Sequence, residues 1–227
     1  MYNNKTFLAV ILARGGSKRL PRKNILELAG KPLISWSIEA GLNSKYIDNV
    51  IVSSDDDEIL NIAKHFKSNI VKRPLELAND TATSFDALKH TIDNVDCYDY
   101  VILLQPTSPL RTSKDIDEAI ELLISKNSDA VISVTEMDHN PLWSNTLPEN
   151  RSMKNFIDRE IINGRSQDLP KYYRLNGAIY ICDRNRLLKE KSFFIEDNIY
   201  AYIMARESSI DIDEMMDFKL AELYIKG

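Results

Sequence analysis

The side chains best suited to chemistry lie in one short stretch near the start of the chain. Residues 14–24 read Arg-Gly-Gly-Ser-Lys-Arg-Leu-Pro-Arg-Lys-Asn, so five cations and two adjacent glycines follow the apolar run Phe7–Ala13. Backbone N–H groups beside glycines can approach an anion closely, and the cations neutralise it. No carboxylate occurs from Arg14 to Leu26, although the whole chain carries a net charge of -5. The stretch therefore indicates a phosphate-binding loop.

A solvated surface turn is the alternative for such a loop, but surface turns seldom follow so apolar a strand. The two commonest phosphate-binding motifs do not account for it. No Gly-x-Gly-x-x-Gly is present, and Gly30–Lys31 is not a P-loop because Ile25 and Pro32 stand where Gly and Ser or Thr are required. We expect neither a dinucleotide-binding fold nor a P-loop ATPase.

Asp211 and Asp213 form a second candidate site near the end of the chain, in the β-type run Ser209–Asp213. In a strand both carboxylates project from one face, and Ile210 and Ile212 are buried on the other. A solvated edge strand would alternate in the same way. Mg²⁺, however, prefers oxygen ligands and is commonly held by one or two carboxylates plus substrate phosphates. With the cationic loop, the pair indicates a metal-bound triphosphate and a phosphoryl or nucleotidyl transfer that depends on charge stabilisation.

The elements that must position these groups alternate between strand and helix. The expected strand-then-helix pairs are Phe7–Ala13 with Leu33–Asn43, Asn49–Ser53 with Glu58–Phe66, Ile70–Lys72 with Phe85–Val95, and Tyr98–Leu104 with Lys114–Ser125. Further strands are expected at 130–135, 174–182 and 200–205, and a last helix at 214–225. This order predicts an α/β fold with a mostly parallel twisted sheet flanked by helices, of the nucleotidyltransferase type.

Polar loops follow several of these strands. In an open α/β sheet the ligand crevice lies beyond the carboxyl ends of the strands, so the loops should converge there. They are the cationic loop, Arg73–Pro74 with Asn79–Thr81, and Gln105–Arg111. The last could instead be a rigid strand-to-helix turn. The acidic triplet Asp55–Asp57 opens a helix, where carboxylates cap N–H groups or contact a ligand.

Composition excludes several classes of function. A chain of 227 residues is long enough for one large α/β domain, and its pI near 5.3 argues against a nucleic-acid binder. Neither a membrane span nor a signal-peptide pattern is present, so we expect a cytoplasmic protein without membrane contact. The two cysteines and three histidines show no spacing typical of a zinc site or of a Cys/His or Ser/His nucleophile.

The regular pattern fails between Met137 and about Pro170, where prolines and Gly164 interrupt a polar stretch. A structureless connection of that length is rare inside a compact domain. We therefore predict a nucleotidyltransferase domain formed by residues 1–137 and 171–227, and an arm of residues 138–170 that packs on a second subunit.

Five ordered motifs resemble those of the N-acylneuraminate cytidylyltransferases, also called CMP-sialic acid synthetases. The motifs are Ala13–Asn24, Arg73–Ala78, Gln105–Arg111, Arg174–Tyr180 and Ser209–Asp213. The resemblance spans about residues 7 to 225. It implies a homodimer built by the arm, and conversion of CTP plus N-acetylneuraminate to the CMP-sugar and pyrophosphate. The anomeric hydroxyl would attack the α-phosphorus in line, made acidic by Mg²⁺ rather than by a dedicated base.

The resemblance also implies roles for individual residues. Those implied to bind the nucleotide are Arg14, Gly15, Gly16, Ser17, Lys23, Asn24, Arg73 and Ser84. Those implied to bind the sugar are Gln105, Asn176, Tyr180, Phe193 and Phe194, although the Phe pair could be plain core. Asp211 and Asp213 are implied to hold Mg²⁺, and the residues implied to act in catalysis are Arg14, Lys23 and Asp211.

Two positions depart from the family's pattern. Arg19 stands where a small residue is usual, so we expect it to point to solvent. Ser166 stands where an arginine commonly reaches the sugar carboxylate, which leaves Arg165 and Lys171 as candidates for that clamp. The alternatives for function are activation of pseudaminic acid, legionaminic acid or Kdo, a nucleotide-sugar-dependent glycosyltransferase, and a non-catalytic CTP-binding module. A glycosyltransferase is disfavoured because its Asp-x-Asp generally follows a mid-chain strand.

Overall fold

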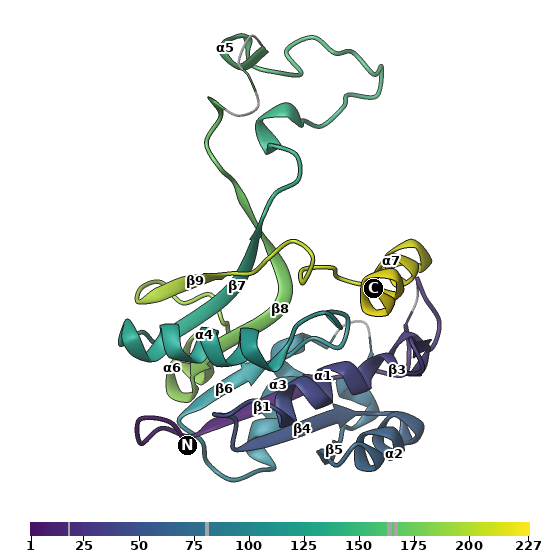
Figure 1. The fold of residues 1–227 in the computed structure, drawn as a ribbon, viewed down its shortest axis with the longest axis vertical. Helices are drawn as coiled ribbons and strands as arrows, with labels where there is room; N and C mark the ends of the chain where they lie inside the picture. The colour runs from purple at the N-terminus through teal and green to yellow at the C-terminus, as the bar shows by residue number, and fades with distance from the viewer. Residues whose placement is uncertain (18, 80–81, 163–164, 166–167) are drawn as a thin grey trace.

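A computed structural model describes residues 1–17, 19–79, 82–162, 165 and 168–227. Of the residues in the motifs above, Lys18, Asp80, Thr81, Gly164 and Ser166 lie outside the described ranges. The centre of the molecule is a seven-stranded sheet, covered by helices (Figure 1). The strands in spatial order are β5 (Asn69–Lys72), β4 (Asn49–Ser54), β1 (Phe7–Leu12), β6 (Tyr100–Leu103), β8 (Tyr173–Asp183), β7 (Ala130–Glu136) and β9 (Ile199–Ile203).

The sheet is mostly parallel, as predicted. β1 pairs in parallel with β4 and β6, β4 with β5, and β7 with β9. β8 is the exception, because it runs antiparallel to both β6 and β7. Its first half therefore lies at the carboxyl end of β6, beside the expected ligand crevice. A separate small hairpin pairs β2 (Glu27–Leu28) with β3 (Lys31–Pro32).

Alternate residues of β1 face two hydrophobic layers, as the period of a strand requires. Phe7, Ala9 and Ile11 join one buried cluster, and Leu8 and Val10 join the other. The helices in the first layer are α1 (Leu33–Leu42), α2 (Asp57–His65) and α4 (Ser113–Ser125); those in the second are α3 (Ser84–Asp93) and α6 (Arg184–Glu190). Burial on both faces explains why the strand reads as a continuous apolar run.

The last helix, α7 (Met215–Lys226), packs through Phe218 and Ala221 on a third cluster that contains Leu28, Leu33 and Ile212. The run from Ser209 to Asp213, predicted as a strand, is not one. It is joined to the end of the sheet by a hydrogen bond from the Ile212 N–H to the Thr107 carbonyl at 2.8 Å. The predicted alternation holds in part: Ile212 is fully buried and Ile210 is half-buried, whereas both aspartates keep exposed surface, although protein atoms partly desolvate the Asp211 carboxyl group.

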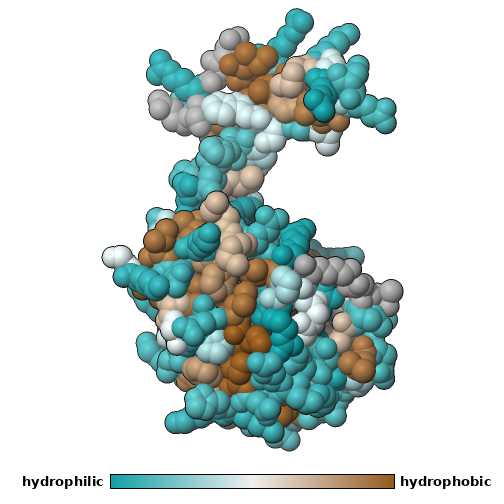
Figure 2. Space-filling model, turned by 90° about the vertical axis from the view of Figure 1, so that its right-hand side faces the viewer, coloured by the Kyte–Doolittle hydropathy of each residue, from teal (hydrophilic) through white to brown (hydrophobic). Residues whose placement is uncertain are grey.

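The predicted arm stands away from the sheet on the ends of β7 and β8 (Figure 1). A hydrogen bond of 2.9 Å from the Met137 N–H to the Tyr172 carbonyl closes its base. The arm contains a short 3-10 helix, Pro141–Trp143, and α5 (Arg159–Ile162). It exposes apolar side chains, among them Leu147, Met153 and Ile162, and the space-filling view shows apolar residues near its tip (Figure 2). Packing of the arm on a second subunit stays a prediction.

Candidate active site

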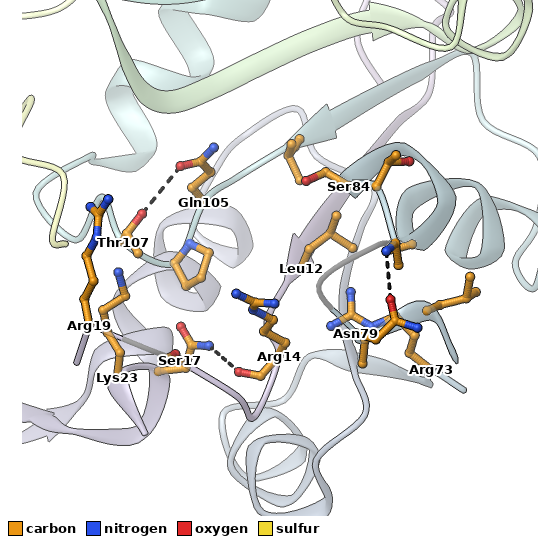
Figure 3. A pocket seen from close by; sticks show the side chains of 18 of the residues that line it. Leu12, Arg14, Ser17, Arg19, Lys23, Arg73, Asn79, Ser84, Gln105 and Thr107 are labelled. Atoms are coloured by element: carbon orange, nitrogen blue, oxygen red, sulfur yellow. Dashed lines mark hydrogen bonds between the residues drawn. The ribbon is translucent and has the colours of Figure 1, made fainter. Parts of the chain in front are cut away.

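A cavity of about 620 Å³ lies at the carboxyl ends of β1, β5 and β6. The three predicted loops and the C-terminal segment meet in it. The charged and polar side chains along its wall include Arg14, Ser17, Arg19, Lys23, Asn24, Arg73, Asn79, Ser84, Gln105, Thr107 and Asp213 (Figure 3). Residues from both ends of the chain thus line a single concave site.

The cationic loop is shaped by hydrogen bonds to its own backbone. The buried Asn24 side chain donates to the Arg14 carbonyl at 3.0 Å, and the Ser17 N–H donates to the Gly15 carbonyl at 3.2 Å. A Cβ on Gly15 would stand 2.7 Å from Oδ2 of Asp56, so only glycine fits there. The loop is therefore held in a fixed turn, with Arg14 and Lys23 on the cavity wall.

The acidic triplet after β4 supports the loop from behind. Asp56 caps α2 by accepting the N–H groups of Glu58 and Ile59, as predicted. It also pairs with Arg22, which faces away from the cavity lining. Asp55 accepts the Gly15 N–H at 3.2 Å and lies 3.6 Å from Nη2 of the buried Arg73. Burial lowers the pKa of Arg73, and Asp55 opposes that shift. The carboxylates thus fix two cation-bearing segments.

Asp213 lies directly against the cationic loop, although about 190 residues separate them in sequence. Arg19 Nη1 donates to its Oδ2 at 2.8 Å, and Lys23 Nζ lies 3.6 Å from its Oδ1. Lys23 also donates to the Ile212 carbonyl. As expected, Arg19 is exposed to solvent, with 67% of its side chain accessible, but it also lines the cavity, where the Asp213 carboxylate holds it.

Asp211, unlike Asp213, is not among the described residues that line the cavity. Burial is the main cause that raises the pKa of the Asp211 carboxyl, and the negative charges of Asp213 and Asp217 raise it further. A hydrogen bond from the Thr107 hydroxyl and the positive charge of Lys23 act in the opposite direction. The Asp211–Asp213 pair offers oxygen ligands to a hard cation, which would relieve their repulsion. No group of three or more His, Cys, Asp or Glu side chains in the described ranges forms a metal site by itself. The pair fits Mg²⁺ that takes its remaining ligands from a substrate.

A second cavity of about 190 Å³ adjoins the first and shares Ser84 and Leu103 with it. Its walls are mainly apolar: the Tyr180 ring lies 5.7 Å from the Phe193 ring and 6.3 Å from the Phe194 ring, between centroids. Phe194 is 55% exposed, so the predicted Phe pair is not simply core. Sequence reasoning missed other lining residues, namely Phe85, Leu88, Lys191 and Ser192.

Arg111 fastens the loop after β6. It is 2% exposed, and its Nη1 donates to the carbonyls of Ala178 at 2.8 Å and Gln105 at 3.3 Å. Burial lowers the pKa of Arg111 to about 10. The alternative interpretation of this loop as a rigid turn is therefore also right, since Thr112 and Asp115 form a capping box that starts α4 directly after it. The rigid turn presents Gln105 to the cavity.

Three predicted sugar ligands are absent from the described walls of both cavities. Asn176 is buried, where its Nδ2 donates to Ser209 Oγ at 3.0 Å and its Oδ1 accepts from Ser133 Oγ at 2.6 Å. Lys171 lies at the base of the arm and pairs with Glu136 at 2.9 Å, and Arg165 is exposed within the arm. Their roles stay predictions.

The chain is similar in sequence to proteins that act on nucleotides. A family model described as cytidylyltransferase matches residues 8–222. An N-acylneuraminate cytidylyltransferase of Escherichia coli is 39% identical over 94% of this chain and 51% of that protein. A pseudaminic acid cytidylyltransferase of Campylobacter jejuni is 36% identical over 96% of each. A CMP-N,N'-diacetyllegionaminic acid synthase of Legionella pneumophila is 35% identical over 95% of this chain and 94% of that protein. The chain thus spans about half the length of the first relative.

The fold is similar to that of two solved structures. One is a CMP:2-keto-3-deoxy-manno-octonic acid synthetase complexed with CTP, with a TM-score of 0.74 at 20% identity and coverage of 97% of this chain and 98% of that one. The other is a 4-diphosphocytidyl-2C-methyl-D-erythritol synthase from Anaerococcus prevotii, with a TM-score of 0.68 at 16% identity and coverage of 98% and 97%. They confirm the predicted fold class.

Proposed function

This chain belongs to the cytidylyltransferase family, and from that premise we propose that it transfers CMP from CTP to a nonulosonic acid and releases pyrophosphate. The observation that carries the proposal is the contact of Lys23 and Arg19 with Asp213 on the wall of one cavity. The cations that could bind a triphosphate, Lys23 and Arg19, thus lie beside a carboxylate that could bind its metal ion, Asp213.

The chain's own residues do the binding and orienting. Arg14, Ser17 and Lys23 would hold the triphosphate, and Arg73 with Ser84 would surround the nucleoside at the other end of the cavity. Gln105 would orient the sugar so that its anomeric hydroxyl faces the α-phosphorus. Mg²⁺ held by Asp211 and Asp213 would supply charge neutralisation and lower the pKa of that hydroxyl. Cations fixed in advance stabilise the departing pyrophosphate without reorganisation during the reaction.

We propose N-acetylneuraminate as the sugar. An aromatic-walled pocket beside the nucleotide cavity suits the methyl and carbonyl of an acylamino group, with Tyr180, Phe193 and Phe194 around it. The relative at 39% identity named N-acylneuraminate cytidylyltransferase supports this choice. Pseudaminic acid, legionaminic acid and Kdo are the alternatives, because relatives and fold neighbours include enzymes named for them.

We also propose that the working form is a cytoplasmic homodimer. The candidates for the carboxylate clamp, Arg165 and Lys171, lie in or beside the arm and do not line the described cavities of their own chain. An arm that crosses to a second copy would bring them to the partner's site. Within the described ranges, no helix combines the length and apolar content that crossing a bilayer demands.

Incubation with CTP, Mg²⁺ and individual nonulosonic acids tests the proposal. We expect pyrophosphate release that depends on the sugar, and a product with the mass of CMP-N-acetylneuraminate. The variant Phe194→Ala, which removes part of the wall of the apolar cavity, should raise the KM for N-acetylneuraminate more than the KM for CTP. Hydrolysis of CTP without a CMP-sugar, or binding without turnover, would contradict the proposed reaction. Preference for another sugar of the panel would correct only the substrate.

A further inference from the structure

We propose that Arg19 is an internal cation that occupies the Asp213 carboxylate in the empty enzyme and exchanges it for the phosphates when nucleotide enters. The inference rests on the proposed function for the identity of the ligand. Its observation is the 2.8 Å hydrogen bond from Arg19 Nη1 to Asp213 Oδ2. Figure 3 shows the Arg19 side chain beside Lys23 and Thr107, on the wall of the nucleotide cavity.

The ion pair is built to exchange rather than to stabilise the fold. The Arg19 side chain is 67% exposed and that of Asp213 is 56% exposed. Exposed pairs contribute little to stability, so separating them costs little. Two other guanidiniums near the site are fixed: Arg111 is buried against two carbonyls, and Arg73 is buried beside Asp55.

The position of Lys23 explains why Arg19 is the residue that moves. Lys23 has only 13% of its side chain exposed and also donates to the Ile212 carbonyl, so it stays with the Asp213 segment. Both oxygens of Asp213 therefore face a cation in the empty site. A divalent cation that arrives without nucleotide competes with both positive charges and binds weakly. A triphosphate supplies the negative charge that draws Arg19 away, so the metal enters together with the nucleotide.

Mn²⁺ binding to the nucleotide-free protein, followed by the electron paramagnetic resonance of free Mn²⁺, tests the first half of the inference. Arg19→Gln should bind Mn²⁺ about fivefold more tightly than the unchanged protein, and Arg19→Lys should not. Arg22→Gln is the matched control, because Arg22 lies in the same loop but pairs with Asp56 and Glu58 outside the cavity lining. The double variant Arg19→Gln with Asp213→Asn should lose the increase in Mn²⁺ affinity.

Calorimetric titration with CTP in the presence of a chelator tests the second half. Arg19→Gln should bind metal-free CTP about fivefold more weakly, and Arg22→Gln should bind it normally. Equal Mn²⁺ affinity in Arg19→Gln and the unchanged protein would overturn the proposal, and unchanged binding of metal-free CTP would overturn the exchange. Neither readout needs turnover, so an enzyme that makes no CMP-sugar would refute the proposed function and leave this test intact.

Discussion

Gly177 and Gln105 lie so close together that a methyl group on Gly177 would push the Gln105 side chain aside. A Cβ on Gly177 would stand 2.8 Å from Oε1 of Gln105 and 3.6 Å from Oδ2 of Asp211. Gly177 lies in β8 with φ at +73°, a conformation that glycine adopts at little cost. Because β8 runs antiparallel to β6, this glycine faces the loop that begins where β6 ends. It leaves room for Gln105, the proposed sugar ligand, close to Asp211, a proposed metal ligand.

Gly177→Ala should therefore damage both the fold and the site. The positive φ costs about 1–2 kcal/mol for alanine, and the added methyl displaces Gln105. We expect a lower free energy of unfolding in urea and a higher KM for the sugar, with the KM for CTP less affected. Gly16→Ala is the control for stability, since a Cβ added at position 16 would have no atom within 4 Å. An unchanged sugar KM would show that Gln105 does not face the sugar.

Lys23→Met should slow the reaction with little effect on folding. Its ammonium group lies 3.6 Å from Asp213 and faces the cavity, where we propose that it stabilises the transferred phosphates. Loss of one such charge costs about 2–4 kcal/mol of transition-state stabilisation, or roughly 30- to 900-fold in kcat/KM. Lys89→Met, which breaks an exposed pair with Asp93 on α3, should retain full activity. Equal rates for both variants would remove Lys23 from the mechanism.

Asp211→Asn should make the protein more stable at neutral pH and inactive. The raised pKa of Asp211 means that folding disfavours its charged form, mainly through burial. That penalty is fully present above the folded pKa and disappears as the pH falls below the ordinary value of 3.8. The gain in melting temperature over the unchanged protein should therefore shrink between pH 7 and pH 4, while Mg²⁺-dependent pyrophosphate release is lost. A gain in melting temperature that does not change with pH would contradict the idea that burial of the charged Asp211 carboxylate destabilises the fold.

Charges on the apolar surface of the arm should separate the proposed dimer. Leu147 and Met153 are 57% and 61% exposed, so Leu147→Asp with Met153→Asp should not unfold the chain. We expect sedimentation as a monomer and loss of sugar turnover, because the partner's arm no longer reaches the site. A double variant that stays dimeric, or a monomer with full activity, would show that the arm does not complete the partner's site.

Local patterns predicted most of the fold because the central strands, among them β1, β4 and β6, are mostly buried. Phe7–Leu12 is recognisable as apolar throughout, and Asp56 and Thr112 mark helix starts by capping. Ligands of open α/β sheets bind beyond the carboxyl ends of the strands, and this rule predicted that the polar loops after those strands line one cavity. The helix Arg184–Glu190 was missed although Asp183 caps it, because only Leu187 of its residues is buried and no apolar period identifies it.

Other parts of the site could not be read from the sequence. Asn176 lies within the Arg174–Tyr180 motif, whose resemblance implies a sugar ligand, yet its amide hydrogen-bonds Ser133 and Ser209 in the interior. Such networks depend on three segments brought together by the fold. Arg19 was expected to point to solvent because it stands where a small residue is usual, and its contact with Asp213 could not be predicted because 194 positions separate the two residues. Lys191 lines the apolar cavity only because the missed helix α6 ends beside Phe193.

A crystal structure with CTP and Mn²⁺ tests the central claim most directly, because anomalous scattering locates the metal. We expect one Mn²⁺ peak beside Asp211 and Asp213, a triphosphate between that peak and the side chains of Arg14 and Lys23, and Arg19 turned from Asp213 to the phosphates. Nucleotide bound elsewhere on the molecule, or metal bound away from both aspartates, would contradict it.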